Sequence, residues 1–310
     1  MAKKVVVTGG AGFIGSHLAG ELLRQGYSVV IYDDLSTGKM ENVDLLLKNK
    51  KTKFIQGTVA DLPQLQEVFR GIEYVFHLAA ISSVPRSIAD PLSPHHVNAT
   101  GTLNVLVAAR DNGVKKVIYA SSSSVYGDTP TLPKREDMPP NPLSPYAVSK
   151  LTGEYYCQVF REVYKLPTVS LRYFNVYGPR QDSDSQYAAA IPRFIKRSYE
   201  GEPPIVFGDG EQTRDFTFVK DAVAASILAA QSGACGMFNI SRGESITINR
   251  LAELIMELVG NRVEPIHQEP RAGDIRHSLA DISKAKGFGY EPKYDLRSGL
   301  AETIRWYHGK

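Results

Sequence analysis

The sequence predicts an α/β fold: a doubly wound parallel sheet with a smaller, discontinuous C-terminal α/β lobe. Short β-branched and aromatic runs alternate with segments whose apolar residues recur at helical spacing, which is the pattern of βαβ units. After about residue 175 the alternation weakens, and Pro179, Pro192, Pro203 and Pro204 interrupt it. The later part of the chain is therefore expected to form a separate lobe over one edge of the sheet.

The elements are expected in a regular order along the chain. Between the first two strands, Ile14, Leu18 and Leu22 recur every four residues, as on one face of a helix. A later helix is expected at 248–259. The pattern assigns 1–175 and 214–241 to the sheet domain, and 176–213 and 242–310 to the lobe. The strands are expected at 5–7, 29–32, 54–55, 74–77, 117–120, 168–172 and 237–240.

Composition and charge exclude several classes of protein. With 43% hydrophobic and 22% charged residues, the chain has an ordinary globular composition. The 36 Lys and Arg nearly balance the 33 Asp and Glu, so no nucleic-acid partner is expected. No apolar stretch approaches the ~20 residues of a membrane helix or the shorter core of a signal peptide. With 2 cysteines and no histidine pair at metal-ligand spacing, we expect a cytoplasmic protein without a metal.

A glycine-rich turn follows the first expected strand. Within residues 8–15, Gly9, Gly12 and Gly15 have G-x-x-G-x-x-G spacing. Such glycines allow a tight turn and close backbone approach to a pyrophosphate, which the following helix N-terminus would stabilise. Asp33 ends the second strand, about 20 residues further on, where a carboxylate accepts hydrogen bonds from ribose and repels a 2′-phosphate. With no Arg directly after it, the sequence predicts NAD rather than NADP on a Rossmann-type sheet.

A candidate proton-transfer pair lies further along the chain. Tyr146 and Lys150 form Y-x-x-x-K, and residues four apart share one face of a helix. A neighbouring cation favours the phenolate of a tyrosine whose pKa, near 10, otherwise makes it a poor base. Serines at 121–124 close the fifth expected strand, at the edge of the sheet where substrates bind. A surface helix pair and an ordinary polar strand end are the alternative interpretations.

Together these motifs resemble those of the extended short-chain dehydrogenase/reductases. Within that family, the chain is most similar to the nucleotide-sugar 4-epimerases, which act on UDP-hexoses and UDP-N-acetylhexosamines. The resemblance implies a UDP-sugar substrate, tightly bound NAD and a homodimer, in which helices at about 100–112 and 146–164 form a four-helix bundle. The matching motifs cover almost the whole length and lie at 8–15, 77–80, 121–127, 146–150, 172–180, 213–216 and 271–274.

The same resemblance implies the catalytic roles. Tyr146 would take the proton of the sugar 4-hydroxyl while C4 gives a hydride to the nicotinamide. Ser122 would hydrogen-bond the same oxygen, and Lys150 would hold the cofactor ribose and tune Tyr146. The 4-keto sugar would then turn over in the pocket and take the hydride back on its opposite face.

The resemblance also implies two sets of binding residues. Arg214 and Arg271 would clamp the diphosphate, in keeping with the bidentate bonds that guanidinium groups make to phosphate. Besides Tyr146 and Lys150, the cofactor set comprises Gly9, Gly12, Phe13, Ile14, Gly15, Asp33, Leu35, Ser36, Thr37, Gly38, Thr58, Val59, Leu78, Ala79, Ala80 and Tyr173. Besides Ser122, the substrate set comprises Ser82, Ser123, Asn175, Ala189, Ala190, Val206, Phe207, Arg214, Arg271, Asp274 and Ser278.

Several residues depart from the family pattern. Ser278 replaces a bulky Tyr of glucose-restricted relatives, and the room gained predicts turnover of UDP-GlcNAc/UDP-GalNAc alongside UDP-Glc/UDP-Gal. Ala189 stands where many relatives have Asn, and Thr58 where many have an Asp that accepts from adenine. Ser123 and Ser124 occupy positions that are acidic in dehydratases, so a dehydratase is not expected.

Three alternatives stay open on the sequence. They are a UDP-glucuronate-type 4-epimerase or decarboxylase, a nucleotide-sugar reductase that uses exchangeable cofactor, and a non-catalytic NAD-binding regulatory protein. The intact Ser122, Tyr146 and Lys150 argue against the last of these.

Overall fold

A parallel sheet of 7 strands, in the order β11-β6-β5-β4-β1-β2-β3, forms the larger part of the protein. The computed structural model describes residues 3–183, 189–261, 263–270 and 275–309. Order and direction confirm the predicted Rossmann-type sheet. Its strands are β1 (Lys4–Thr8), β2 (Ser28–Asp33), β3 (Thr52–Gln56), β4 (Tyr74–His77), β5 (Lys116–Ser122), β6 (Thr168–Tyr173) and β11 (Gly236–Ile240).

Helices cover both faces of this sheet because alternate strand residues point to opposite sides. On β1, Val5 and Val7 belong to one core and Val6 to the other. The first core is completed by α1 (Phe13–Arg24) and α9 (Val219–Gln231), and the second by α3 (Leu62–Val68), α6 (Gly101–Asp111) and α7 (Pro145–Tyr164).

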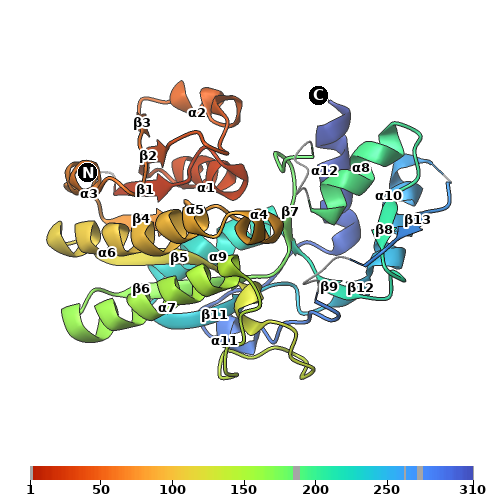
Figure 1. The fold of residues 1–310 in the computed structure, drawn as a ribbon. Helices are drawn as coiled ribbons and strands as arrows, with labels where there is room; N and C mark the ends of the chain where they lie inside the picture. The colour runs from red at the N-terminus through yellow and green to blue at the C-terminus, as the bar shows by residue number, and fades with distance from the viewer. Residues whose placement is uncertain (1–2, 184–188, 262, 271–274, 310) are drawn as a thin grey trace.

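The smaller lobe lies beside the carboxyl edge of the sheet, on the right in Figure 1. Its core is formed by α8 (Ala190–Tyr199), α10 (Ile248–Val259) and α12 (Leu296–His308). Three strand pairs flank these helices: β8 (Ile205–Phe207) with β13 (Ile266–Gln268), β9 (Thr213–Asp215) with β12 (Ser245–Thr247), and β7 (Val176–Tyr177) with β10 (Thr217–Phe218).

One part of the segment assigned to the lobe packs against the sheet instead. Ala285 and Tyr290 are fully buried in the first sheet core, and α11 (Ser283–Lys286) lies against β11. The apolar side chains around 285–290 therefore close the sheet beyond β11 rather than extend the lobe.

Short helices make the remaining connections. No helix in the described part of the chain is long and apolar enough to cross a bilayer. The short helices are η1 (Met40–Asn42), α2 (Asp44–Leu47), α4 (Val84–Ala89), α5 (Leu92–Pro94), the π-helical turn η2 (His95–Thr100) and η3 (Ser123–Tyr126).

Candidate functional site

A cavity of about 670 Å³ opens between the carboxyl ends of the strands and the lobe. This is the position at which ligands bind in open α/β sheets. The predicted residues that line it are Gly9, Gly12, Phe13, Ile14, Gly15, Asp33, Ser36, Thr37, Val59, Leu78, Ala79, Ala80, Ser82, Ser122, Ser123, Tyr146, Lys150, Tyr173, Asn175, Ala189, Ala190, Phe207 and Arg214.

The glycine turn is packed too tightly for side chains. A Cβ on Gly9 would lie 2.7 Å from the backbone nitrogen of Ala79, and Gly9 has a φ of +69°. A Cβ on Gly15 would lie 2.1 Å from the carbonyl oxygen of Gly9. The backbone of the turn is thereby exposed to the cavity at the N-terminus of α1, which fits the pyrophosphate of a dinucleotide.

The Asp33 carboxylate lies at the end of β2, beside the turn. Its Oδ2 accepts a hydrogen bond from the backbone N–H of Ala11 (2.9 Å), and its Oδ1 accepts one from that of Leu35 (2.8 Å). Burial raises the pKa of Asp33, and these backbone donors oppose the shift. A carboxylate oriented in this way fits the ribose of NAD.

Three predicted cofactor residues do not line the cavity. Leu35 donates its N–H to Asp33, and a Cβ on Gly38 would lie 2.7 Å from Asp33 Oδ1. These residues surround the carboxylate instead of facing the cavity. The Oγ1 of Thr58 accepts a local hydrogen bond from the N–H of Ala60 (3.3 Å), and its neighbours Gly57 and Val59 line the cavity in its place.

Tyr146 and Lys150 reach the cavity from the first turns of α7. That helix begins where Ser144 accepts a hydrogen bond from the N–H of Ala147 (3.1 Å) and Pro145 occupies the first turn. The Lys150 Nζ donates to the carbonyl oxygen of Ala120 (2.8 Å) on β5. A side chain of α7 is thus directly linked to the backbone near the end of β5.

Burial shifts the pKa of both Tyr146 and Lys150. It lowers the pKa of Lys150 to about 7, against the smaller raising effects of Cys157 and Glu154. It raises the pKa of Tyr146, while a hydrogen bond with Ser122 lowers it. A partly buried tyrosine, a serine and a lysine therefore line one cavity, where they can bind a hydroxyl and move its proton.

The lobe brings an aromatic ring and cations to the other end. The Arg193 guanidinium lies 5.1 Å from the centroid of the Phe207 ring. The Gln212 Nε2 donates to the carbonyl oxygen of Phe207 (2.7 Å), and the Arg214 Nη1 donates to that of Thr213 (2.9 Å). Arg193 and Gln212 line the cavity but belong to no motif, so only their position in the fold reveals them.

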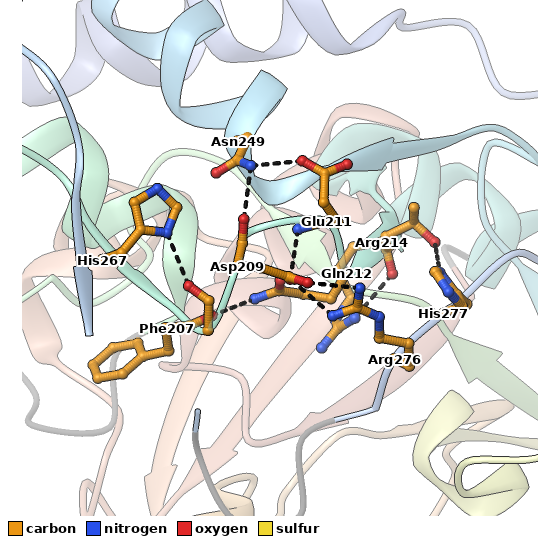
Figure 2. A network of polar contacts seen from close by, with 11 residues as sticks. Phe207, Asp209, Glu211, Gln212, Arg214, Asn249, His267, Arg276 and His277 are labelled. Atoms are coloured by element: carbon orange, nitrogen blue, oxygen red, sulfur yellow. Dashed lines mark hydrogen bonds and ion pairs between the residues drawn. The ribbon is translucent and has the colours of Figure 1, made fainter. Parts of the chain in front are cut away.

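A polar network holds the turn that follows Phe207 (Figure 2). Asp209 accepts two hydrogen bonds from Arg276 (2.8 and 2.9 Å), and this ion pair lowers the pKa of Asp209 to about 2. The Asn249 Nδ2 donates to the backbone carbonyl of Asp209 (2.9 Å) and to Glu211 (2.7 Å). The network joins the turn to α10 and to the chain at 275–278.

Two predicted substrate residues lie off the cavity. Val206 is fully buried in the lobe core, because alternate residues of β8 face opposite ways and Ile205 and Phe207 take the cavity side. Ser278 is 8% exposed, and its N–H donates to the carbonyl of Thr213 (3.1 Å). Arg271 and Asp274 lie outside the described residues.

Comparison with known proteins decides the family. The sequence model of the NAD dependent epimerase/dehydratase family matches residues 5–241. The chain belongs to this family. It is thus an enzyme of the epimerase class that depends on NAD, as the sequence predicts.

Similar proteins are matched over nearly their full length. The chain is 40% identical to the UDP-glucose 4-epimerase of Mycolicibacterium smegmatis, over 99% of both chains. The UDP-N-acetylglucosamine 4-epimerase of Methanobrevibacter ruminantium, solved with UDP-N-acetylmuramic acid, is 44% identical with a TM-score of 0.95, over 99% of both chains. The UDP-glucose 4-epimerase of Thermotoga maritima, solved with UDP-glucose, is 40% identical with a TM-score of 0.94, again over 99% of both.

Proposed function

We propose that the enzyme is a UDP-sugar 4-epimerase that interconverts UDP-GlcNAc with UDP-GalNAc and UDP-Glc with UDP-Gal. The observation that carries this proposal is that Ser122, Tyr146 and Lys150 line one cavity. The glycine turn and the lobe residues Arg193 and Arg214 line the same cavity. We further propose the cytoplasm as its compartment, where the free thiols of Cys157 and Cys235 would stay reduced.

In this proposal Tyr146 is the general base and acid. Its buried phenol takes the proton of the sugar 4-hydroxyl and later returns it to the 4-keto oxygen. Ser122 hydrogen-bonds the same sugar oxygen and holds it beside the phenol. Bound NAD supplies the hydride acceptor and donor for C4.

Lys150 acts on the ionisation of Tyr146. Burial favours the neutral phenol, so the base form needs positive charge nearby. Lys150 lies one helical turn further along α7, and its Nζ is fixed by the Ala120 carbonyl. Its ammonium would stabilise the phenolate and hold the cofactor ribose.

The lobe would bind the UDP part of the substrate. Arg193 and Arg214 bring positive charge for the diphosphate, and Phe207 with Ile205 offers an apolar surface for the base. Arg271 and Asp274 would complete this set. Asn175, whose Nδ2 donates to the Asp215 carbonyl (2.9 Å), would lie where diphosphate and sugar meet.

The cavity favours an uncharged sugar over a uronic acid. Among the described lining residues, the cations are Lys150, Arg193 and Arg214. Arg193 and Arg214 lie with Phe207 on the lobe, and Lys150 is directed to Ala120. In this proposal these cations serve the diphosphate and the cofactor, and none of them is assigned to a sugar carboxylate.

Small side chains favour acceptance of N-acetylated sugars. Ala80, Ser82 and Ser123 line the cavity close to the catalytic end, where they leave space for an acetamido group. The similar UDP-N-acetylglucosamine 4-epimerase supports the same substrate class. Ser278 does not line the cavity, so its small size is not the basis of this proposal.

Turnover of separate UDP-sugars tests the function. Purified enzyme is incubated with UDP-GlcNAc, UDP-Glc or UDP-glucuronate, and products are followed through their anomeric protons by NMR. We expect the first two to be epimerised without added NADH, and Tyr146→Phe to lower kcat by about 10²–10⁴-fold. Turnover of UDP-glucuronate alone, or consumption of added NADH, would support an alternative enzyme. No turnover with any sugar would indicate a non-catalytic protein.

We also propose a homodimer through α6 and α7. Val148, Tyr155, Val159 and Val163 recur at helical spacing on α7 and are 47–63% exposed. They lie on the side of the helix away from Lys150, which is buried toward β5. An apolar stripe of this kind is typical of a helix that packs against another chain.

A further inference from the structure

A buried ion pair lies next to the catalytic residues and has no part in the proposed chemistry. Glu154 on α7 and Arg172 on β6 have side chains that are 0% and 2% exposed. The Arg172 Nε donates to Glu154 Oε1 (2.8 Å), and its Nη2 donates to Oε2 (2.7 Å). This bidentate geometry joins α7 rigidly to the sheet.

A third residue connects the pair to β5, the strand that ends with Ser122. The Ser121 hydroxyl donates to Glu154 Oε1 (2.5 Å), and Ser121 is the register partner of Arg172 across β5 and β6. Ser121 stands between Ala120, whose carbonyl accepts from the Lys150 Nζ, and Ser122. The hydroxyl of Ser121 thus ties the carboxyl end of β5 to α7.

Arg172 also supports the chain on the other side of Ser122. Its guanidinium lies 4.6 Å from the centroid of the Tyr126 ring, which belongs to η3, the turn that follows Ser122. The Glu154–Arg172 pair therefore contacts the chain on both sides of Ser122. Ser121, before it, hydrogen-bonds Glu154, and Tyr126, after it, packs on Arg172.

Stability alone is a weak reason for this arrangement. Two charges lose their hydration when they are buried, and apolar replacements of such pairs are often as stable or more stable. The Arg172 Nη1 is also buried without a hydrogen-bond partner. The pair therefore brings little stability, but it contacts the segments that carry Ser122 and Lys150. We infer that its role is to position these two residues.

By binding the Glu154 carboxylate, Arg172 also keeps it from pairing with Lys150. Glu154 lies one helical turn after Lys150, and residues at this spacing interact when their charges are opposite. Because Arg172 takes both carboxylate oxygens, Lys150 is left to the Ala120 carbonyl and to the cavity.

We propose that Ser121, Glu154 and Arg172 form a positioning unit that fixes where the side chains of Ser122 and Lys150 lie relative to Tyr146. This proposal rests on the proposed epimerase function. The three residues are positioning residues, because the unit acts through the backbone of β5 and the spacing between β5 and α7.

The test replaces the pair without leaving a buried charge. Glu154→Leu/Arg172→Met is compared with the wild-type enzyme in thermal unfolding, UDP affinity, kcat and KM. The matched control is Lys116→Met at the far end of β5, whose buried amine donates to the carbonyls of Ala229, in the last turn of α9, and Ser232, just after it. We expect the double variant to fold and bind UDP like the wild type, with kcat lowered about 10–100-fold and the control unchanged. A stable double variant with wild-type kcat would overturn the proposal.

Ser121→Ala keeps the test decisive if the double variant does not fold. It removes one hydroxyl and leaves the ion pair intact, so kcat should fall several-fold while KM and UDP affinity stay unchanged. Wild-type kcat in Ser121→Ala would contradict the proposal.

A titration separates this proposal from the epimerase function. Ionisation of Tyr146 is followed by its phenolate absorbance in the NAD-bound protein, with Tyr146→Phe as the blank. Ser122 from β5 hydrogen-bonds the Tyr146 phenol, and the Tyr119 phenol, also from β5, interacts with it electrostatically. Lys150 follows one turn later on α7, and Ser87 from α4 accepts a hydrogen bond from the backbone N–H of Tyr146. Displacement of Lys150 and Ser122 should raise the pKa of Tyr146 in the double variant, whether or not any UDP-sugar is turned over. An unchanged pKa would count against the positioning unit, whereas inactivity of the wild type would count only against the epimerase.

Discussion

Gly15→Ala should remove NAD binding while leaving most of the fold intact. The third residue of α1 faces the turn that precedes it, and its Cβ would lie 2.1 Å from the Gly9 carbonyl oxygen and 2.8 Å from the Gly10 Cα. Both are backbone atoms, so no side chain can rotate away. The helix and the turn would have to separate by about 1 Å, which opens the surface where the pyrophosphate fits.

The free energy of this change follows from two opposing contributions. Overpacking of a close contact costs about 1–3 kcal/mol, and Ala in place of Gly in a helix returns about 0.5–1 kcal/mol. A modest net loss of stability is therefore expected, together with a large loss of bound NAD because the turn is displaced.

Gly20→Ala in the same helix is the matched control. Its Cβ would meet only the Leu46 Cδ2, at 3.5 Å, which is ordinary contact. It should gain about 0.5–1 kcal/mol in unfolding free energy and retain NAD. Bound nucleotide is released by heat, measured by absorbance and compared with denaturant unfolding curves. Wild-type NAD content in Gly15→Ala would refute the reasoning.

Two further predictions concern the lobe and the surface. Burial raises the pKa of Asp215 to about 6, whereas an unfolded Asp titrates near 3.9, so the folded state alone binds the proton between these values and stability falls as pH rises through that window. The amide of Asp215→Asn can still accept from the N–H groups of Gly243 and Ala280. The variant should therefore be about 1–3 kcal/mol more stable at pH 7, and its unfolding free energy, measured by denaturant titration, should not fall between about pH 4 and 6. The same fall with pH in the variant would show that Asp215 is not its source. If the proposed dimer forms through α7, light scattering should give a dimer mass for the wild type and a monomer mass for Val159→Arg, with the monomer's stability within about 0.5 kcal/mol of the wild type. A monomeric wild type, or a variant that stays dimeric, would contradict the proposed interface.

Local periodicity predicted most of the sheet. Strand runs such as 5–7 and 117–120 are apolar because both faces of a parallel sheet are covered, and each became part of a longer strand. The glycine turn, Asp33 and the Tyr146–Lys150 spacing were visible because close backbone approach and helical neighbours impose fixed sequence intervals.

Other site residues depend on contacts between distant segments. Arg193 meets Phe207 only because α8 folds over β8, and neither Arg193 nor Gln212 stands at a fixed interval from a motif. Val206 was predicted at the cavity together with Phe207, but the two-residue period of the strand directs it into the lobe core.

The sequence by itself determined the family, the NAD dependence and the elements that carry Ser122, Tyr146 and Lys150, since these follow from short-range spacing. Only the tertiary structure decided which side chains face the cavity and which support it from behind. Glu154 and Arg172 show the difference, because they are 18 residues apart in sequence and their ion pair exists only where α7 packs on β6. Burial turns such separated residues into one unit, since a charge removed from water must find its partner within the fold.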